Sequence, residues 1–405
     1  MTKIKIALLF CILASSAAVN PISAASAKCT PLPKTIGVAA GKNTAYAWNL
    51  SGEAFSWGRG DKGQRGDGTT SYSKNKPQDI KAVKYVHKIS SYGATALILQ
   101  RDGLVYSVGS NTFGQLGLGS KQNYSIPQKV KSLSCVIDIA AGPDTSYAVK
   151  ADGSVWGWGY NADDELNIGN SWPALTPKKI IGLSNIIAIS ASEYNLLALS
   201  SNGSVFALGD NFDGQLGTGD TEDPNRYPVK VKGLALKPKS IAIYGETSGA
   251  VQQDGSVVLW GSPGRVYAAD DSILSPQTVP LAGQAKSIVL GSWHALVIDK
   301  SNNLWTWGSN RKGALGLGLD EFCYFSDEQS CEGYDASGFY FHINYTPTIV
   351  LRNVSSVAAG DEFTVAVQKD GTTWAWGSGT SGQLGNGYGF NRTKPSKVFF
   401  LKLNK

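Results

Sequence analysis

The stretch "GSNTFGQLGLG", residues 109–119, decides the fold because the chain repeats it. Close copies are "GDNFDGQLGTG" at 209–219 and "GSGTSGQLGNG" at 377–387. Each copy starts at a glycine that ends a short apolar segment, and such glycines lie 47 to 69 residues apart: Gly58, Gly109, Gly159, Gly209, Gly261, Gly308 and Gly377. A second marker keeps a similar step, at Pro77, Pro127, Pro177, Pro228, Pro276, Pro347 and Pro395. Two independent markers therefore predict seven units of about fifty residues.

Each unit is predicted to form short strands rather than helices. Segments such as "VIDIAAG" and "TSYAVKADGSVWGWG" are rich in β-branched and aromatic residues. Asp-Gly or Asn-Gly pairs at 102, 152, 202, 254 and 370 favour tight hairpins with both central residues at positive φ. Tryptophans two positions apart, such as Trp156 and Trp158, share one side of a strand, so we expect them to fill the gap between neighbouring sheets.

Seven units of three or four short strands predict an all-β fold, a seven-bladed β-propeller over residues 28–405. The chain enters the repeat partway through a unit, at "IGVAAGKNTAYAW". It ends with "TKPSKVFFLKL", which matches the opening part of later units. We therefore expect the last segment to complete the first blade, so that N- and C-terminal strands close the ring in one sheet without an open edge.

The repeat resembles that of the regulator of chromosome condensation family. That motif runs Ala-Ala-Gly, a short strand, Asp-Gly, Trp-Gly and then Asn-x-x-Gly-Gln-Leu-Gly-x-Gly, and the match covers about residues 36–405. Unit five departs with "GSPGRVYAADD" and unit three with "NADDELNIG", so we expect differently shaped loops there. The family's histidine after the glycine survives as His294, for which a structural hydrogen bond is the favoured role.

The stretch "GRGDKGQRGDGT" at 58–69 contains the cell-adhesion tripeptide Arg-Gly-Asp twice. It aligns position for position with 109–119, so its glycines are those of the repeat, except Gly60, which stands at the family's Asn position. Drift within the repeat is therefore favoured over an adhesive function, because such short motifs often occur by chance. Arg65 is unusual, since it stands at a position that other units give to leucine: Leu116, Leu216, Leu315 and Leu384.

The first 27 residues are predicted to be a signal peptide. Lys3 and Lys5 precede an apolar run at 6–13, and small residues lead to a cleavage site before Lys28. No other apolar run approaches the roughly 20 residues that span a membrane. The mature chain would carry a net charge of +4, because the sequence total is +6 and this segment holds two lysines. We expect a secreted or periplasmic monomer with no membrane span and no nucleic-acid partner.

Four cysteines remain after that cleavage, an even number in an oxidising compartment. A disulfide is predicted between Cys323 and Cys331, which are close in sequence. Whether Cys29 pairs with Cys135 is left open by the sequence. The spacing of all four is wrong for zinc, so no metal is expected.

Unit six carries a long insertion between the closing glycine of its loop motif and the next proline. It has 28 residues there, 319–346, where units two and seven have seven. Its aromatic richness argues against disorder, and a short disulfide could hold it in one shape. We expect it to be the main partner-binding element, since pre-organised Tyr and Phe side chains are good interface anchors, with these contact residues: Phe322, Tyr324, Phe325, Tyr334, Phe339, Tyr340 and His342.

Function is inferred by elimination and by resemblance. The chain has three histidines, no nucleophile motif and no phosphate-cradling loop, so neither an enzyme nor a cofactor is expected. The family's founding member is a nuclear exchange factor for a small GTPase, and other relatives use the disc to bind proteins. Export argues against the nuclear role. The favoured function is a protein-binding platform, with a GTPase regulator, an extracellular enzyme and an Arg-Gly-Asp adhesin as the alternatives.

Overall fold

The computed structural model describes most of the chain beyond the predicted signal peptide. Of 331–334, 340, 341 and 400 only the backbone is described. The described residues are 29–162, 166–169, 172–222, 227–262, 266, 272–319, 331–334 and 340–403.

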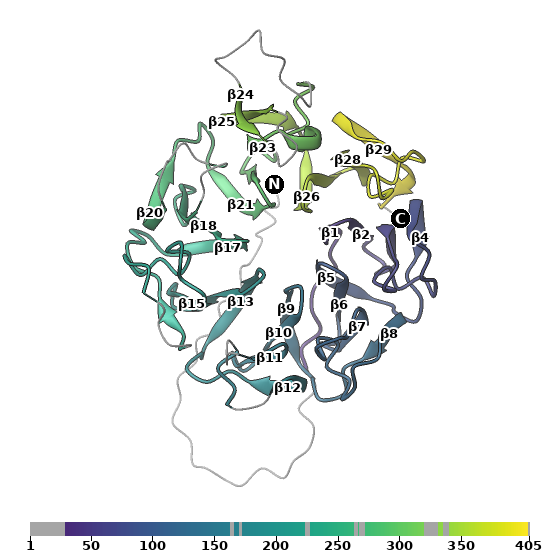
Figure 1. The fold of residues 1–405 in the computed structure, drawn as a ribbon, viewed down its shortest axis with the longest axis vertical. Coiled ribbons are helices and arrows are strands. Elements are labelled where there is room, and N and C mark those ends of the chain that lie inside the picture. The colour runs from purple at the N-terminus through teal and green to yellow at the C-terminus, as the bar shows by residue number, and fades with distance from the viewer. Residues whose placement is uncertain are drawn as a thin grey trace, which may run out of the picture.

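Seven antiparallel sheets stand around a central axis like the blades of a propeller, as predicted (Figure 1). In each blade the first strand lies nearest the axis and the following strands lie progressively further out. Blade one holds β1 (Gly37–Ala40), β2 (Thr44–Trp48), β3 (Ala54–Arg59) and β4 (Ser73–Asp79); blade two holds β5 (Val86–Tyr92), β6 (Thr95–Gln100), β7 (Val105–Gly109) and β8 (Tyr124–Lys129). Blade three holds β9 (Val136–Ala141), β10 (Thr145–Lys150), β11 (Val155–Gly159) and β12 (Ala174–Lys179); blade four holds β13 (Ile186–Ala191), β14 (Asn195–Ser200), β15 (Val205–Gly209) and β16 (Val229–Lys230).

The remaining three blades follow the same order, with one addition in blade six. Blade five holds β17 (Pro238–Tyr244), β18 (Thr247–Gln252), β19 (Val257–Gly261) and β20 (Ile273–Val279). Blade six holds β21 (Ala285–Leu290), β22 (His294–Asp299), β23 (Leu304–Ser309), the short 3-10 helix η1 (Arg311–Gly313), the added strand β24 (Cys331–Tyr334) and β25 (Tyr340–Leu351). Blade seven holds β26 (Val354–Ala359), β27 (Phe363–Gln368), β28 (Thr372–Gly377) and β29 (Arg392–Lys402).

The hairpins between second and third strands occur at the Asp-Gly and Asn-Gly pairs, but their geometry corrects one expectation. Only the glycine takes a positive φ, for example 76° at Gly153. Asp152 instead accepts hydrogen bonds at Oδ1 from the backbone N–H of Ser154 (2.9 Å) and from its hydroxyl (2.6 Å). The aspartate therefore fixes the turn through its carboxylate, which an Asp in a turn often does.

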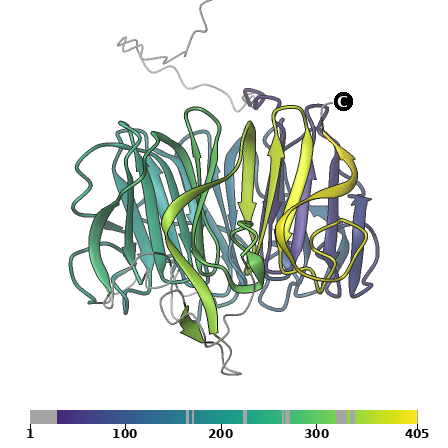
Figure 2. The ribbon, with the colours of Figure 1, turned by 90° about the horizontal axis from the view of Figure 1, so that it is seen from above.

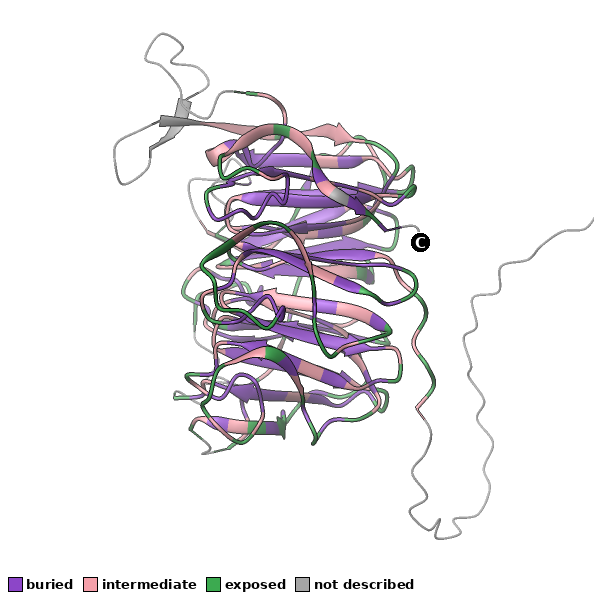
Figure 3. Cartoon of the chain, turned by 90° about the vertical axis from the view of Figure 1, so that its right-hand side faces the viewer, coloured by how far each residue is buried: buried purple, intermediate pink, exposed green. Residues whose placement is uncertain are grey.

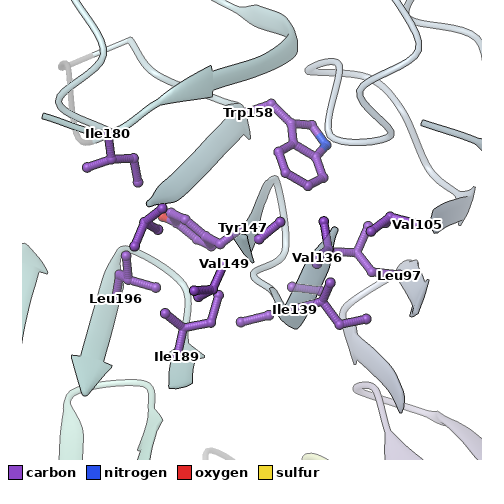
Figure 4. Close-up of a cluster of buried hydrophobic side chains, with 14 of the residues drawn as sticks. Leu97, Val105, Val136, Ile139, Tyr147, Val149, Trp158, Ile180, Ile189 and Leu196 are labelled. Carbon is purple, nitrogen blue, oxygen red and sulfur yellow. The ribbon is translucent and has the colours of Figure 1, made fainter. Parts of the chain in front are cut away.

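Neighbouring blades pack face to face, so the second strand of a blade is buried on both sides, whereas the first strand at the axis is only partly buried (Figure 3). Every residue of β6, β14 and β22 is buried, and these strands do not alternate between apolar and polar residues. Figure 4 shows one such layer, in which Leu97 of blade two meets Val136 and Ile139 of blade three. Burial of these layers is the main apolar stabilisation of the ring.

In four blades, the tryptophan just before the glycine that ends the third strand donates a hydrogen bond to the loop of the preceding blade. Trp158 Nε1 donates to the carbonyl of Gln115 (2.8 Å), and Trp260 does so to Gln215 (2.9 Å). Gly117 lies against the first indole: a Cβ there would sit 2.8 Å from Nε1, and its φ is +71°. The Gly-Gln-Leu-Gly motif thus contributes to packing between blades, because its glycines let the loop approach the next blade closely.

Trp307 is the exception among the described residues. Its indole N–H is buried and has no hydrogen-bond partner. The preceding loop, in blade five, reads "GSPGRVYAADD" and lacks the motif whose carbonyl accepts this bond elsewhere. The departure seen in the sequence therefore leaves one donor unsatisfied.

The predicted closure of the ring through a shared blade is wrong. β29 pairs with β28 of its own blade, with Trp374 opposite Lys397, and β1 pairs with β2. The proline-containing segment after each loop returns to the outer edge of the blade it left, where the third strand offers its free edge. The end of the chain does match earlier units, but the matched segments are fourth strands rather than first strands.

The ring closes instead through the loop of blade seven, which docks on blade one. Trp57 Nε1 donates to the Gln383 carbonyl (2.8 Å). Asn75 donates through Nδ2 to the carbonyl of Gly387 (2.8 Å), and the Gly387 N–H donates to the Asn75 carbonyl (2.9 Å). Closure therefore uses the same loop-to-tryptophan contact that joins other blades.

The segment before β1 lies against the hairpin between β6 and β7 of blade two. The Leu32 N–H donates to the carbonyl of Arg101 at 2.7 Å. Cys29 and Cys135, 106 residues apart, meet in disulfide geometry with Cα atoms 5.1 Å apart. The predicted Cys323–Cys331 bond lies outside the described side chains, so it stays a prediction.

Candidate functional site

The two faces of the disc differ. Because the strands are antiparallel, the turns after first strands and the loops after third strands emerge on one side, which we call the loop face. The tight hairpins and the links between blades emerge on the other side, the hairpin face. Figure 2 shows β25 running past the edge of the disc on the side opposite the C-terminus. The described part of the blade six insertion therefore belongs to the loop face.

The described part of the insertion is a hairpin of β24 and β25. Tyr334 and Tyr340 are opposite each other in its register, and Cys331 is opposite His342. The carbonyl of half-buried His342 accepts the N–H of Asn310 (2.8 Å), which anchors the base of the hairpin. The remaining predicted contact residues lie outside the described residues, so their role stays a prediction: Phe322, Tyr324, Phe325 and Phe339.

Exposed aromatic side chains gather on the loop face. Eight described Tyr, Trp and Phe side chains are classed as exposed, and Tyr85 alone lies on the hairpin face. Phe212, in the loop of blade four, is 74% exposed. The other six are in loop-face turns and loops of blades one, three, four and seven: Tyr72, Trp172, Tyr194, Tyr227, Tyr388 and Phe390. Tyr, Trp and Phe are enriched at protein interfaces, so this face is the candidate binding surface.

Two tyrosines meet at the centre of the loop face. Tyr92 of blade two and Tyr244 of blade five have ring centroids 5.0 Å apart. Burial raises the pKa of both phenols well above their usual range, and the Tyr92 hydroxyl lies 3.4 Å from Glu193 Oε1. A cavity of about 270 Å³ lies beside them at the axis.

The acids on one side of that cavity are paired with bases. Lys42 Nζ lies 3.8 Å from Asp361, and the Arg311 guanidinium bonds Glu362. The Arg311 guanidinium also lies 5.2 Å from the centre of the Trp293 ring. These contacts bridge blades one, six and seven, so the charge there is balanced.

A second cavity of about 390 Å³ lies between blades three and four on the same face. Its walls include Asp144 and Glu193, which occupy equivalent turns, and Glu193 borders both cavities. Burial and the charge of Glu193 raise the pKa of Asp144. Sequence reasoning missed these acids. The repeat register places the turn between first and second strands in every unit, but it does not say which acids of these turns meet in space.

The histidine and the adhesion motifs have structural roles. His294 is buried, its Nε2 lies 3.1 Å from the Thr364 hydroxyl, and burial lowers its pKa to about 4. Arg59 is paired with Asp61 (2.7 Å), and the fully buried Arg65 is paired with Asp67 (2.9 Å). A recognition motif must present both charges to solvent, so this geometry gives the adhesion alternative no support.

The described residues contain no cluster of three or more His, Cys, Asp or Glu side chains suited to a metal ion. Within the same residues we find no helix with the length and apolar character needed to cross a membrane.

The fold and the repeated loops define a class: a seven-bladed propeller of chromosome-condensation-regulator type. The profile of the RCC1-like domain matches residues 15–267, and profiles of the regulator of chromosome condensation (RCC1) repeat match 285–314, 354–383, 301–367 and 370–405. The chain belongs to the RCC1-like domain family.

Curated relatives match over part of their length. The ultraviolet-B receptor UVR8 of Arabidopsis thaliana is 32% identical over 143 residues, 34% of this chain and 28% of that protein. Ras guanine nucleotide exchange factor C of Dictyostelium discoideum is 30% identical over 29% of this chain and 9% of that protein. The probable E3 ubiquitin-protein ligase HERC3 of Homo sapiens is 28% identical over 35% of this chain and 12% of that protein.

Solved structures confirm the fold over nearly the whole chain. Prp20p of Saccharomyces cerevisiae, described with its binding to Gsp1p and histones, has a TM-score of 0.72 at 22% identity and covers 86% of both chains. Yeast RCC1 (Prp20) bound to Kap60 has a TM-score of 0.73 at 22% identity, with 96% of this chain and 91% of that chain covered. At this identity the likeness concerns the fold.

Proposed function

We propose that this protein is a non-catalytic binding platform whose loop face holds a protein partner. The observation that carries the proposal is the concentration of exposed aromatic side chains on that face, seven of the eight described. The β24–β25 hairpin projects from the same face. Tyr and Trp are enriched at protein interfaces because they bury a large area with few rotatable bonds.

The comparisons are compatible with this function without deciding it. A yeast protein of the same fold is described in complex with Kap60, and another description reports binding to Gsp1p and histones. Some relatives are ubiquitin ligases or exchange factors, but the chain matches only 12% and 9% of those proteins. A regulator of a small GTPase is therefore the second candidate, with family resemblance as its support.

Export is part of the proposal, supported by the amino-terminal sequence. The protein recovered from the periplasm or medium should begin at Lys28 when its terminus is sequenced. Recovery in the cytoplasm alone, with residues 1–27 retained, would remove the argument against a GTPase partner.

The insertion can be tested by replacing residues 319–346 with the seven-residue loop of blade two, 120–126, so that Tyr124 takes the place opposite Gly308 that Asn344 holds. In blade two the side chain of Asn123 accepts the Asn111 N–H (2.8 Å), as the carbonyl of His342 accepts that of Asn310. The replacement therefore supplies the bond that anchors the loop, and the propeller should stay folded. Affinity capture with the mature protein should recover a partner that the replaced variant does not.

A matched pair of point variants tests the face as a whole. Phe212→Ala on the loop face should weaken capture, whereas Tyr85→Ala on the hairpin face should not, although both side chains are more than half exposed. If every folded variant captured the partner equally well, the loop face would not be the binding surface.

A further inference from the structure

The two acids that line the cavity between blades three and four have no basic partner in the described part of the chain. Asp144 and Glu193 occupy equivalent turns of blades three and four. No Lys or Arg nitrogen of the described residues lies within 4.0 Å of either carboxylate. Their counterparts across the axis, Asp361 and Glu362, are both paired. Glu246, in the equivalent turn of blade five, also has no Lys or Arg partner among the described residues, so the unpaired acids of these turns lie in blades three, four and five.

Aromatic rings form much of the wall of the cavity that these acids share. Tyr147 is buried there, Tyr160 is half-buried, and Tyr194 is 56% exposed at its rim. Phe113 lies edge-on to Tyr160, with centroids 5.1 Å apart and an interplanar angle of 89°, which fixes that ring. The face of an aromatic ring carries partial negative charge, so it attracts a cation.

The Thr145 hydroxyl is a second, independent feature of this cavity, because it is buried without a hydrogen-bond partner in the described structure. Thr145 lines the cavity and is 4% exposed, and its Oγ1 has no hydrogen-bond partner. Thr95 and Thr247, at the same place in blades two and five, donate to the carbonyls of Ser110 (3.1 Å) and Ser262 (2.8 Å). A buried hydroxyl without a partner is unfavourable unless something else bonds it.

We propose that the cavity between blades three and four binds an alkylammonium group, such as the end of a lysine side chain on the partner's surface. The ammonium has three N–H donors, and the cavity offers three acceptor groups: the Asp144 carboxylate, the Glu193 carboxylate and the Thr145 hydroxyl. The tyrosine rings pack against the methylene groups that carry the charge. Asp144 already accepts a bond from Gln115 Nε2 (3.0 Å), which holds the carboxylate in place.

This inference deepens the proposed function, because it names the chemistry of a group on the partner. It can be tested without knowing the partner. The probes are Nα-acetyl-lysine methylamide, tetralysine and spermidine, titrated into the mature protein by calorimetry, with tetraglutamate as the negative probe. The cationic probes should bind and tetraglutamate should not, and raised salt should weaken binding.

Substitutions that keep side-chain shape locate the site. Asp144→Asn and Glu193→Gln should each weaken binding of the lysine probes about fivefold or more, because a charged acceptor bonds roughly 1 kcal/mol better than a neutral one. Asp361→Asn, the matched control from the paired side of the same face, should change affinity less than twofold. Thermal unfolding of each variant checks that the fold is retained.

Thr145→Val separates a binding role from a structural one. It removes a hydroxyl that bonds nothing in the described structure, so stability should be unchanged or slightly higher. The affinity for the lysine probes should nevertheless fall severalfold. Unchanged affinity in this variant would contradict the role of the hydroxyl.

The outcomes distinguish two sources of the cation, a lysine side chain and a free polyamine, and they also test whether the site exists. Tighter binding of spermidine than of tetralysine, lost in the Asp144→Asn/Glu193→Gln double variant, supports the site and assigns a free polyamine to it. No binding of any cationic probe by the folded protein at millimolar concentration would overturn the proposal, as would full binding by the double variant. The variant lacking the insertion should still bind the probes, so failure here is distinguishable from failure of the platform.

Discussion

Arg65 is the residue whose substitution tests the structure most sharply. Its side chain is fully buried at a position where blade two has Leu116. All five N–H donors of the guanidinium are used: Nε bonds Asp67 Oδ2 (2.9 Å), Nη1 bonds the carbonyls of Gly58 (3.1 Å) and Ser71 (2.9 Å), and Nη2 bonds the hydroxyls of Thr69 (2.8 Å) and Ser71 (2.7 Å).

The Arg65 guanidinium takes the place of an asparagine side chain that holds the loop of blade two together. In blade two Asn111 donates to the carbonyls of Ser120 (2.8 Å) and Gln122 (2.9 Å) and accepts the Leu116 N–H (2.9 Å). Blade one has Gly60 at that place, and a Cβ there would lie 1.8 Å from Arg65 Nη1. Arginine and glycine in blade one thus do together what asparagine and leucine do in blade two.

The magnitude follows from the burial of the pair. Arg65→Leu leaves the Asp67 carboxylate, 5% exposed in its side chain, without its cation. Removing one partner of a buried ion pair costs about 3–5 kcal/mol. With an unfolding entropy of about 2.1 cal/mol/K per residue, a ring of roughly 375 residues loses about 1.3 °C per kcal/mol. The unfolding midpoint should therefore fall by about 4–7 °C.

The assay compares this variant with the triple variant Gly60→Asn/Arg65→Leu/Asp67→Leu, which copies the second loop at these positions. The triple variant should recover most of the lost midpoint, because it removes the buried charge and restores the asparagine. Differential scanning calorimetry of both against the unchanged protein measures the effect. A single variant that unfolds within a degree of the unchanged protein would refute the reasoning, as would a triple variant no more stable than the single one.

Three further predictions concern His294, two buried tryptophans and the Cys29–Cys135 pair. Burial depresses the pKa of His294 to about 4 from its usual 6.5, so the unfolded chain takes up the proton first. Stability should be complete above about pH 6.5 and should fall by about 3 kcal/mol as the pH drops to about 4; urea unfolding of His294→Gln should show a smaller loss in this window. Trp57→Phe and Trp307→Phe both shorten a fully buried side chain, but only the first breaks the bond that closes the ring, so it should cost about 1 kcal/mol more; equal effects in urea unfolding would count against the closure described. Peptide mapping without reduction should recover Cys29 linked to Cys135, and free thiols at both positions would contradict the observed pairing.

Much of the fold was predictable, because strands and turns obey local rules. The spacing of the glycines gave seven blades, and the Asp-Gly pairs marked the hairpins correctly. The binding residues were less accessible. The contact residues predicted in the insertion lie mostly outside the described structure, while the acids of the blade three and four cavity escaped notice. A single acid in a turn has no distinguishing pattern until its neighbour in space is known.

The sequence by itself determined the repeat, the strand content, the place of the insertion and the unusual loop of blade five, because each depends on residues close together along the chain. Only the tertiary structure decided how the ring closes, why Arg65 can be buried, and which acids lack a basic partner. These features depend on the geometry of the disc, which brings the loop of blade seven onto Trp57 and sets Asp144 beside Glu193, 49 positions further along. Contacts of that range follow from how blades pack around an axis, and no local pattern encodes them.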